Sequence, residues 1–124
     1  MGSAYVAGPI FVMEDKMDNI KNLIQDINTK IDQVVEEFYQ QKTQEAYEHL
    51  NETIGTMLTL IDRISSMQED QKEINGEDFL NALKETLGAI EERDAILVAD
   101  ILKYEVQDRL NDLMESIGEG TQNE

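Results

Sequence analysis

The chain has 124 residues, of which 40% are hydrophobic, and its 27 acidic against 10 basic side chains give a formal net charge of −17. This excess of acid excludes nucleic acid and anionic membrane surfaces as partners, because both are bound through clusters of Lys and Arg. Cysteine is absent, which excludes disulfides, thiolate nucleophiles and cysteine-ligated zinc. The apolar runs are shorter than the roughly 20 residues that cross a bilayer. We therefore expect a cytoplasmic protein.

Helix-favouring residues dominate and the one proline lies near the N-terminus, so the composition predicts an all-α protein. Residues 1–13 are expected to form a flexible N-terminal lead, in part derived from cloning, because Met1-Gly2-Ser3 is typical of an expression vector. Residues 14–117 are predicted to form a single helical-bundle domain. The polar residues 118–124 are predicted to be a disordered tail.

Four segments carry apolar residues at steps of three and four, which is the pattern of amphipathic helices. Short polar connections make consecutive helices antiparallel neighbours, so the chain is predicted to form an up-down-up-down four-helix bundle. The second apolar stripe includes Leu58, and Gly55 and Gly88 inside helices are expected to mark close backbone approach. The long helices are predicted near residues 15–40, 44–67, 76–92 and 95–117.

The short polar connections also supply candidate helix caps. Thr43 is expected to cap the second helix and Asp94 the fourth, since Ser, Thr, Asp and Asn side chains accept hydrogen bonds from the free N–H groups of a first turn. Acidic residues in these first turns suit the positive end of the helix dipole. These positions therefore set the predicted helix starts.

The start of the fourth helix, residues 95–105, differs from the other helical segments because it is apolar on two faces. One face continues the stripe of the second half of the helix, at Val106 and Leu110. The other face, nearly opposite, holds Leu97, Ile101 and Tyr104. In a four-helix bundle, a second apolar face indicates a crossing helix, an oligomer interface or a pocket.

Asp100 lies beside this second face. A carboxylate there needs a cation, a hydrogen-bond donor or a proton, because burial of an unpaired charge is costly. Candidate partners are Lys103 and Tyr104 in the next helical turn, together with the more distant Arg63, Lys84 and Arg93. Asp100, Tyr104 and Asp94 are the candidate catalytic residues. A satisfied structural pair is the alternative, and it is the commoner role of such a carboxylate.

Carboxylates at facing helix ends also suggest a hard-cation site, and the candidate metal ligands are Glu36, Glu91, Asp94 and Asp100. The spacings Glu45-x-x-Glu48 and Glu91-x-x-Asp94 resemble the paired carboxylate motifs of all-helical nucleotide pyrophosphohydrolases. That resemblance implies Mg²⁺-dependent nucleotide chemistry. A chain with 27 acidic residues produces such spacings by chance. We therefore expect Mg²⁺ only if the protein processes nucleotides, and we predict no other cofactor.

His49 is the only histidine. A single exposed histidine on a helix is also found in helical phosphotransfer domains. Here Glu45, Glu48 and Glu52 surround it with negative charge that would repel a phosphoryl group. The sequence therefore predicts a solvated surface histidine.

Several segments resemble a small, uncharacterised helical family of clostridia and related bacteria, over roughly residues 31–115. They are Glu37-Phe-Tyr39, Ala46-Tyr-x-x-Leu50, Leu58-x-Leu-Ile-Asp62 and the Ala-Asp-x-Leu-x-Tyr-Glu segment at residues 99–105. In this chain Ala95 and Lys103 depart from the family pattern, where an aromatic and an acidic residue are usual. The resemblance implies the fold and compartment, and no activity.

We therefore predict a non-catalytic interaction or regulatory module whose partner is another protein or a second copy of the chain. Two alternatives remain. One is an all-α protein that processes nucleotides or transfers phosphoryl groups through the carboxylate cluster with a divalent metal. The other is a purely structural homodimer whose seam is the second face of the fourth helix.

Overall fold

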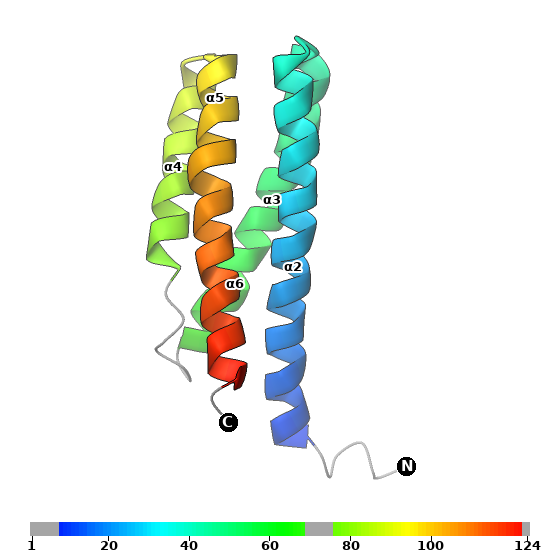
Figure 1. The fold of residues 1–124 in the computed structure, drawn as a ribbon, viewed down its shortest axis with the longest axis vertical. Coiled ribbons are helices and arrows are strands. Elements are labelled where there is room, and N and C mark those ends of the chain that lie inside the picture. Colours follow the sequence, from blue (N-terminus) through cyan, green and yellow to red (C-terminus); the bar gives the residue numbers. More distant parts are fainter. Residues whose placement is uncertain (1–7, 69–75, 123–124) are drawn as a thin grey trace.

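The computed structural model describes residues 8–68 and 76–122, and every element in those ranges is helical. The long helices run alternately in opposite directions (Figure 1). This confirms the predicted all-α, up-down-up-down bundle. The helices are α2 (Gly8–Tyr39), α3 (Thr43–Gln68), α4 (Glu77–Glu91) and a fourth long helix that comprises α5 (Ala95–Ile101), η1 (Leu102–Val106) and α6 (Gln107–Gln122).

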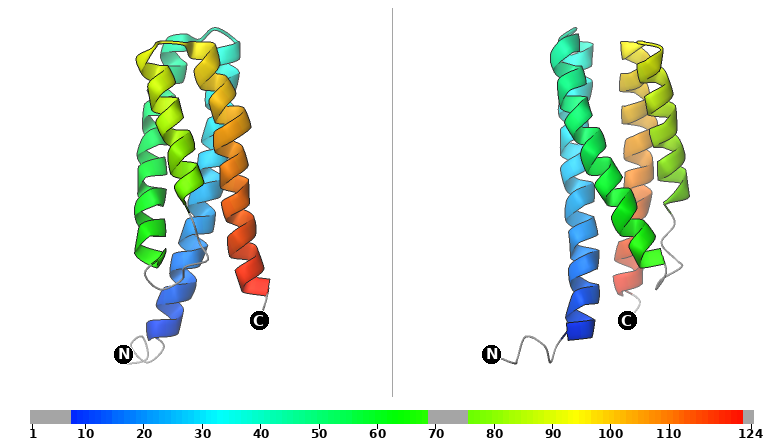
Figure 2. Two further views of the ribbon diagram at one scale, coloured as in Figure 1. Left: turned by 90° about the vertical axis from the view of Figure 1, so that its left-hand side faces the viewer. Right: turned by 180° about the vertical axis from the view of Figure 1, so that it is seen from behind.

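The bundle is built from two helical hairpins. Helix α2 packs along α3, and α4 packs along the fourth helix. The hairpins meet where α2 lies against α5, η1 and α6. Figure 2 shows α3 leaving the end with the tight turns beside α2 and running obliquely toward the far end of α6. The pair formed by α2 and the fourth helix is therefore the centre of the structure.

Helices α2 and α3 carry heptad spacings. Their buried positions alternate steps of four and three residues, which is the pattern of two helices packed knobs into holes. Leu58, which the sequence pattern placed in the stripe, is 54% exposed, and Leu60 takes its place. The buried heptad positions are 20, 24, 27, 31, 34 and 38 in α2, where Val35 is buried as well, and 46, 50, 53, 57, 60, 64 and 67 in α3.

Thr53 explains the error over Leu58. It occupies a heptad position of α3 and is 1% exposed. Its hydroxyl donates to the backbone carbonyl of His49 at 2.8 Å, so the side chain enters the core without an unpaired polar atom. A polar residue in the stripe interrupts the apolar pattern that a sequence analysis follows.

The fourth helix has a different spacing. Its buried positions include 99, 102, 106, 110, 113 and 117, so two successive steps of four residues surround Val106. An extra step of four locally unwinds a helix that keeps its apolar side against its neighbours. The π-helical turn η1 lies at this point, and the N–H of Gln107 donates to the carbonyl of Leu102 five residues earlier. The predicted helix near 95–117 is therefore continuous but not uniformly α-helical.

Both hairpins turn through the same backbone motif. The N–H of Gln41 donates to the carbonyl of Phe38 at 3.0 Å. The N–H of Lys42 donates to the carbonyl of Glu37 at 2.8 Å. This is a Schellman turn, and it places Gln41 in the left-handed region with φ 65°. The turn after α4 repeats the pattern, with Arg93 at φ 58°.

The two predicted caps differ in outcome. The Asp94 carboxylate accepts a hydrogen bond from the N–H of Leu97 at 3.1 Å, so Asp94 caps the fourth helix as predicted. Thr43 is instead the first residue of α3, and the carbonyl of Lys42 accepts the bond from Ala46. The expectation that Thr43 is the cap is wrong, because α3 begins at Thr43 itself, directly after the Schellman turn.

Two predicted boundaries also differ. Helix α2 begins at Gly8, so part of the lead expected over residues 1–13 is helical. Pro9 is compatible with this start, because proline is tolerated in the first turn of a helix. Helix α6 continues to Gln122, through most of the tail expected to be disordered over 118–124. The loop predicted after Met67 lies mostly outside the described residues.

The helical glycines do not mark close approach. A Cβ added to Gly55 or Gly88 would meet no neighbouring atom within 4 Å outside the backbone of its own helix, so that expectation is wrong. The close contact is at Gly76, the residue before α4, where a Cβ would lie 3.2 Å from Cγ2 of Ile64. The start of α4 is therefore packed against the last turns of α3.

We predict that Gly55→Ala and Gly88→Ala each raise the free energy of unfolding by about 1 kcal/mol, because alanine has the higher helix propensity and its methyl group meets open space. Urea denaturation measures the change. Gly76→Ala is the control and should give no gain, since its methyl group would crowd Ile64 and alanine is a poorer N-cap than glycine. A loss of stability in Gly55→Ala would contradict this description of α3.

Candidate functional site

The Asp100 carboxylate is paired with a phenol from another helix. Tyr39 is the last residue of α2, and its hydroxyl donates to Oδ1 of Asp100 in α5 at 2.7 Å. Asp100 is half-buried, and Tyr39 is 43% exposed. The hydrogen-bond donor that this carboxylate needed is therefore Tyr39, which the sequence analysis did not include among the candidates. The contact joins the two hairpins near their tight turns.

This hydrogen bond keeps the proton on Tyr39. It raises the pKa of the phenol from 10.0 to about 12, mainly because Asp100 accepts the proton in the hydrogen bond. Partial burial and the negative charge of Asp100 act in the same direction, since both disfavour a phenolate. Tyr39 is therefore a neutral donor at physiological pH, not a general base.

A cation lies over this contact. Nζ of Lys103 is 5.9 Å from the ring centroid of Tyr39 and 5.4 Å from that of Tyr104. Both distances are within the range of about 6 Å in which an ammonium is attracted by an aromatic face. Lys103 and Tyr104 both belong to the π-helical turn η1. We call Tyr39, Asp100, Lys103 and Tyr104 the tyrosine cluster.

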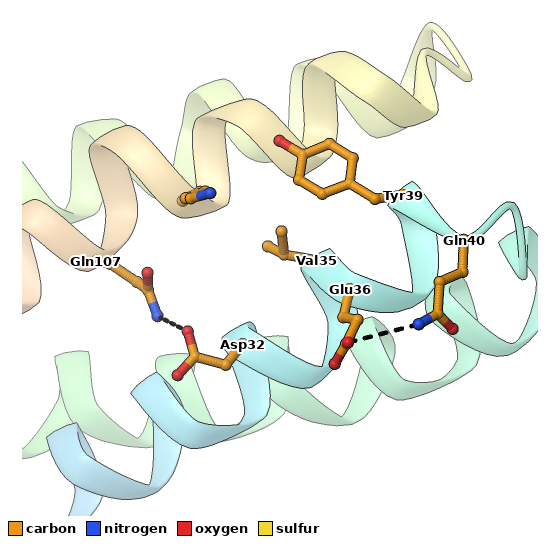
Figure 3. A pocket seen from close by; sticks show the side chains of 7 residues that line it. Asp32, Val35, Glu36, Tyr39, Gln40 and Gln107 are labelled. Carbon is orange, nitrogen blue, oxygen red and sulfur yellow. Dashed lines mark hydrogen bonds between the residues drawn. The ribbon is translucent and has the colours of Figure 1, made fainter.

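A hollow of about 450 Å³ lies beside the tyrosine cluster, between α2 and the fourth helix. Figure 3 shows Val35 and Tyr39 pointing from α2 toward the fourth helix, with Gln107 on the opposite side of the hollow. The exposed carboxylates of Asp32 and Glu36 make its α2 side acidic. The lining residues are Asp32, Val35, Glu36, Tyr39, Gln40, Lys103 and Gln107.

A row of polar contacts continues from the hollow along the same two helices. The Gln107 amide donates to Oδ1 of Asp32 at 2.8 Å (Figure 3). It also donates to the backbone carbonyl of Asn28 at 3.2 Å. One turn further, the Asn28 amide donates to Oδ1 of Asn111 at 3.5 Å. Together with the bond between Tyr39 and Asp100, these contacts hold α2 and the fourth helix in one register.

The second apolar face predicted for the fourth helix is only partly covered. Ile101 is buried, whereas Leu97 is 39% and Tyr104 65% exposed. Ile96, one turn before Asp100, is 53% exposed. No crossing helix covers this face within the described residues. The large apolar side chains of Ile96 and Leu97, which precede Asp100 in the same helix, are therefore exposed to solvent.

The structure does not gather the four candidate metal ligands. Asp94 caps α5, Glu36 accepts a hydrogen bond from the amide of Gln40 at 3.4 Å, and Glu91 is exposed at the end of α4. Among the described side chains, no three from His, Asp and Glu lie close enough together to hold a metal ion. The predicted set of Glu36, Glu91, Asp94 and Asp100 thus provides separate carboxylates rather than one site.

His49 forms an ion pair that the sequence analysis did not include. Its Nδ1 lies 2.9 Å from both carboxylate oxygens of Glu37, which comes from α2. The pKa of the imidazole is raised, mainly by this hydrogen bond and also by the negative charges of Glu37, Glu52 and Glu48, while partial burial opposes the rise. The side chain of His49 is 43% exposed. It is therefore a surface residue, as predicted, but one held by a neighbouring helix.

The family model described as a domain of unknown function, DUF8042, matches residues 15–116. The chain belongs to the DUF8042 family. No curated protein and no solved structure is significantly similar to it. Within residues 8–68 and 76–122, none of the helices has a stretch long and apolar enough to pass through a bilayer.

The local sequence pattern indicates one side of the candidate site of this DUF8042 member but not the other. Asp100 and Tyr104 stood out because they interrupt the pattern of one helix. Tyr39, Asp32 and Gln107 had no such signal, since each looks like an ordinary residue on a polar helix face. These residues line the site only because of the register between α2 and the fourth helix. Periodicity within one helix cannot predict that register.

We predict that Asp100→Asn lowers the pKa of Tyr39 from about 12 toward the ordinary value near 10. The substitution keeps the side-chain shape and removes the negative charge that opposes a phenolate. Tyrosine ring signals followed by NMR at alkaline pH measure the change. Because the folded-state pKa is the raised one, the stability from this contact is complete below about pH 10 and is lost as the pH rises through 12. An unchanged Tyr39 titration in Asp100→Asn would contradict the contact.

We also predict a pH-dependent contribution from His49. Its pKa is raised in the folded state, so the stabilisation is complete below the unfolded value near 6.5 and is lost as the pH rises through the folded value. The difference in unfolding free energy between the wild type and His49→Gln should therefore shrink as the pH rises. Denaturation between about pH 5.5 and about pH 9 measures it. Glu37→Gln should remove the same pH dependence, and a dependence that survives in that variant would assign it to other groups.

Proposed function

We propose that this DUF8042 member is a non-catalytic interaction module that binds a basic segment of another protein. The proposed binding surface is the tyrosine cluster together with Ile96 and Leu97, which we call the α5 face. The observation that carries the proposal is the exposure of Ile96, Leu97 and, two turns further along the same helix, Tyr104. Aromatic side chains at such positions are enriched in protein interfaces, because one ring supplies both apolar area and a polar contact.

The charge of the surface supports a basic partner. The chain carries −17, and the hollow next to the α5 face has Asp32 and Glu36 on its α2 side. An acidic surface steers a positively charged partner during encounter and disfavours an acidic one. The apolar side chains would then provide the buried contact, while the carboxylates at the rim select the partner by charge.

A second copy of the chain fits this surface less well than a basic partner. In a two-fold dimer the same patch faces itself, so the carboxylates beside the α5 face would approach those of the other copy. Two surfaces of equal negative charge repel each other across an interface. Sedimentation velocity at several concentrations should therefore show a monomer. A dimer that dissociates in Tyr104→Ala would instead favour the structural homodimer.

The resemblance to a family of clostridia and related bacteria, which is narrower than the match to DUF8042, is part of the same proposal. We take the family to be the small helical family of clostridia and related bacteria, whose Ala-Asp-x-Leu-x-Tyr-Glu segment corresponds to residues 99–105. That segment contains Asp100 and Tyr104, so two members of the tyrosine cluster lie in it. A cytoplasmic location accords with the composition, and the module would act there through its partner.

Site-specific cross-linking tests the proposal. A photoreactive phenylalanine analogue at position 96 should cross-link to a partner protein in cells that naturally make this chain. The matched control is the same analogue at position 58 in α3, because Leu58 is 54% and Ile96 is 53% exposed. Tyr104→Ala should abolish the cross-link from position 96 and leave the thermal melting curve unchanged. Equal cross-linking from both positions would show non-specific contact and contradict a binding surface on α5.

A further inference from the structure

We propose that an arginine side chain of the partner displaces Lys103 from between the Tyr39 and Tyr104 rings and enters the neighbouring hollow. This inference rests on the proposed function, because it specifies the partner's chemistry at the same surface. Lys103 then acts as an internal substitute for the ligand, holding the site until the partner arrives.

The position between the two rings already holds a cation. Nζ of Lys103 lies 5.9 Å from the Tyr39 centroid and 5.4 Å from the Tyr104 centroid. The Tyr39 ring is held in place at its far end, since its hydroxyl donates to Asp100 at 2.7 Å. A ring fixed in this way presents the same face to any cation that enters, so the site is organised before a ligand binds.

Lys103 is free to leave. Its side chain is exposed, and within the part of the chain that the structure describes it makes no ion pair. A lysine ammonium is compact and strongly hydrated, and it regains full hydration when it moves into water. The contacts that hold Lys103 over the rings are thus of the weak, solvent-exposed kind.

The hollow beside the rings suits a guanidinium better than a second ammonium. Arginine presents five donors on a flat group that stacks on aromatic faces. The hollow offers acceptors from the Asp32 and Glu36 carboxylates and from the amide oxygens of Gln40 and Gln107. Its volume of about 450 Å³ lies within the range of small-ligand sites. An arginine can therefore satisfy several donors there while its planar group lies over a tyrosine ring.

The test compares two lysine substitutions that change the net charge equally. Lys103→Met removes the internal cation, while Lys84→Met removes an exposed lysine from α4. The probe is N-acetyl-arginine methylamide, and its neutral counterpart is N-acetyl-norleucine methylamide. The readout is the NMR signals of the tyrosine rings. Tyr47 serves as the internal reference, because its ring packs edge-on against Phe38 with centroids 4.9 Å apart.

The arginine probe should shift the Tyr39 and Tyr104 signals together and leave Tyr47 unchanged. Its affinity for Lys103→Met should exceed that for the wild type by about five-fold or more, because a site occupied most of the time by its own lysine binds a competitor correspondingly less tightly. Lys84→Met should bind like the wild type, and the norleucine probe should not shift either ring. Lys103→Gln should reproduce the gain.

Three results would overturn the inference. An equal gain in Lys103→Met and Lys84→Met would show attraction to net charge alone. An unchanged affinity in Lys103→Met would show that Lys103 does not occupy the ligand's position. Equal shifts from the norleucine probe would show apolar docking without cation recognition. Each can occur while the cross-link from position 96 is still observed, so failure of this inference is distinct from failure of the interaction module itself.

Discussion

The contact between α2 and the fourth helix is the one on which the rest of the fold depends. Helix α3 packs along α2 and α4 along the fourth helix, so this contact is what joins two hairpins into one bundle. The interior of this contact is apolar, but a row of hydrogen bonds lies along one border. The row begins with the bond between Tyr39 and Asp100 and ends with the bond between Asn28 and Asn111. Sliding one helix by a turn would keep the apolar stripes in contact and separate these polar pairs. The polar row therefore selects one register among several that the apolar residues alone would accept.

The candidate site arises from a difference in helix spacing within this contact. Helix α2 keeps a heptad spacing, whereas the fourth helix contains an extra step of four residues around Val106. The π-helical turn takes up that difference and carries Lys103 and Tyr104 on its outer side. A turn with a wider hydrogen-bond ring is less favourable than an α-helical turn. This turn lies beside the paired carboxylate Asp100 and the exposed rings of Tyr39 and Tyr104, so the irregular part of the helix coincides with the surface proposed for binding.

The chain demonstrates what periodicity can and cannot predict. Four helices, their order and their antiparallel arrangement follow from local patterns, and so does Asp94 as a cap. Periodicity does not indicate Leu60, because buried Thr53 interrupts the stripe. It does not indicate Tyr39 either, because the role of Tyr39 depends on a residue 61 positions away. The pattern of one helix is enough to single out Asp100. It is not enough to identify the partner of Asp100, because the sequence pattern of a single helix does not determine its register against a distant helix.

The π-helical turn also has a consequence for comparing members of the family. A turn closed five residues back contains one residue more than an α-helical turn, so it accommodates a single-residue length difference without displacing the helix on either side. The core positions before Leu102 and after Val106 would remain in contact with α2 if one residue between them were absent. In an alignment of DUF8042 sequences, a one-residue gap inside an otherwise continuous fourth helix belongs within residues 102–106. A chain with that gap would lack the geometry that holds an ammonium over two tyrosine rings.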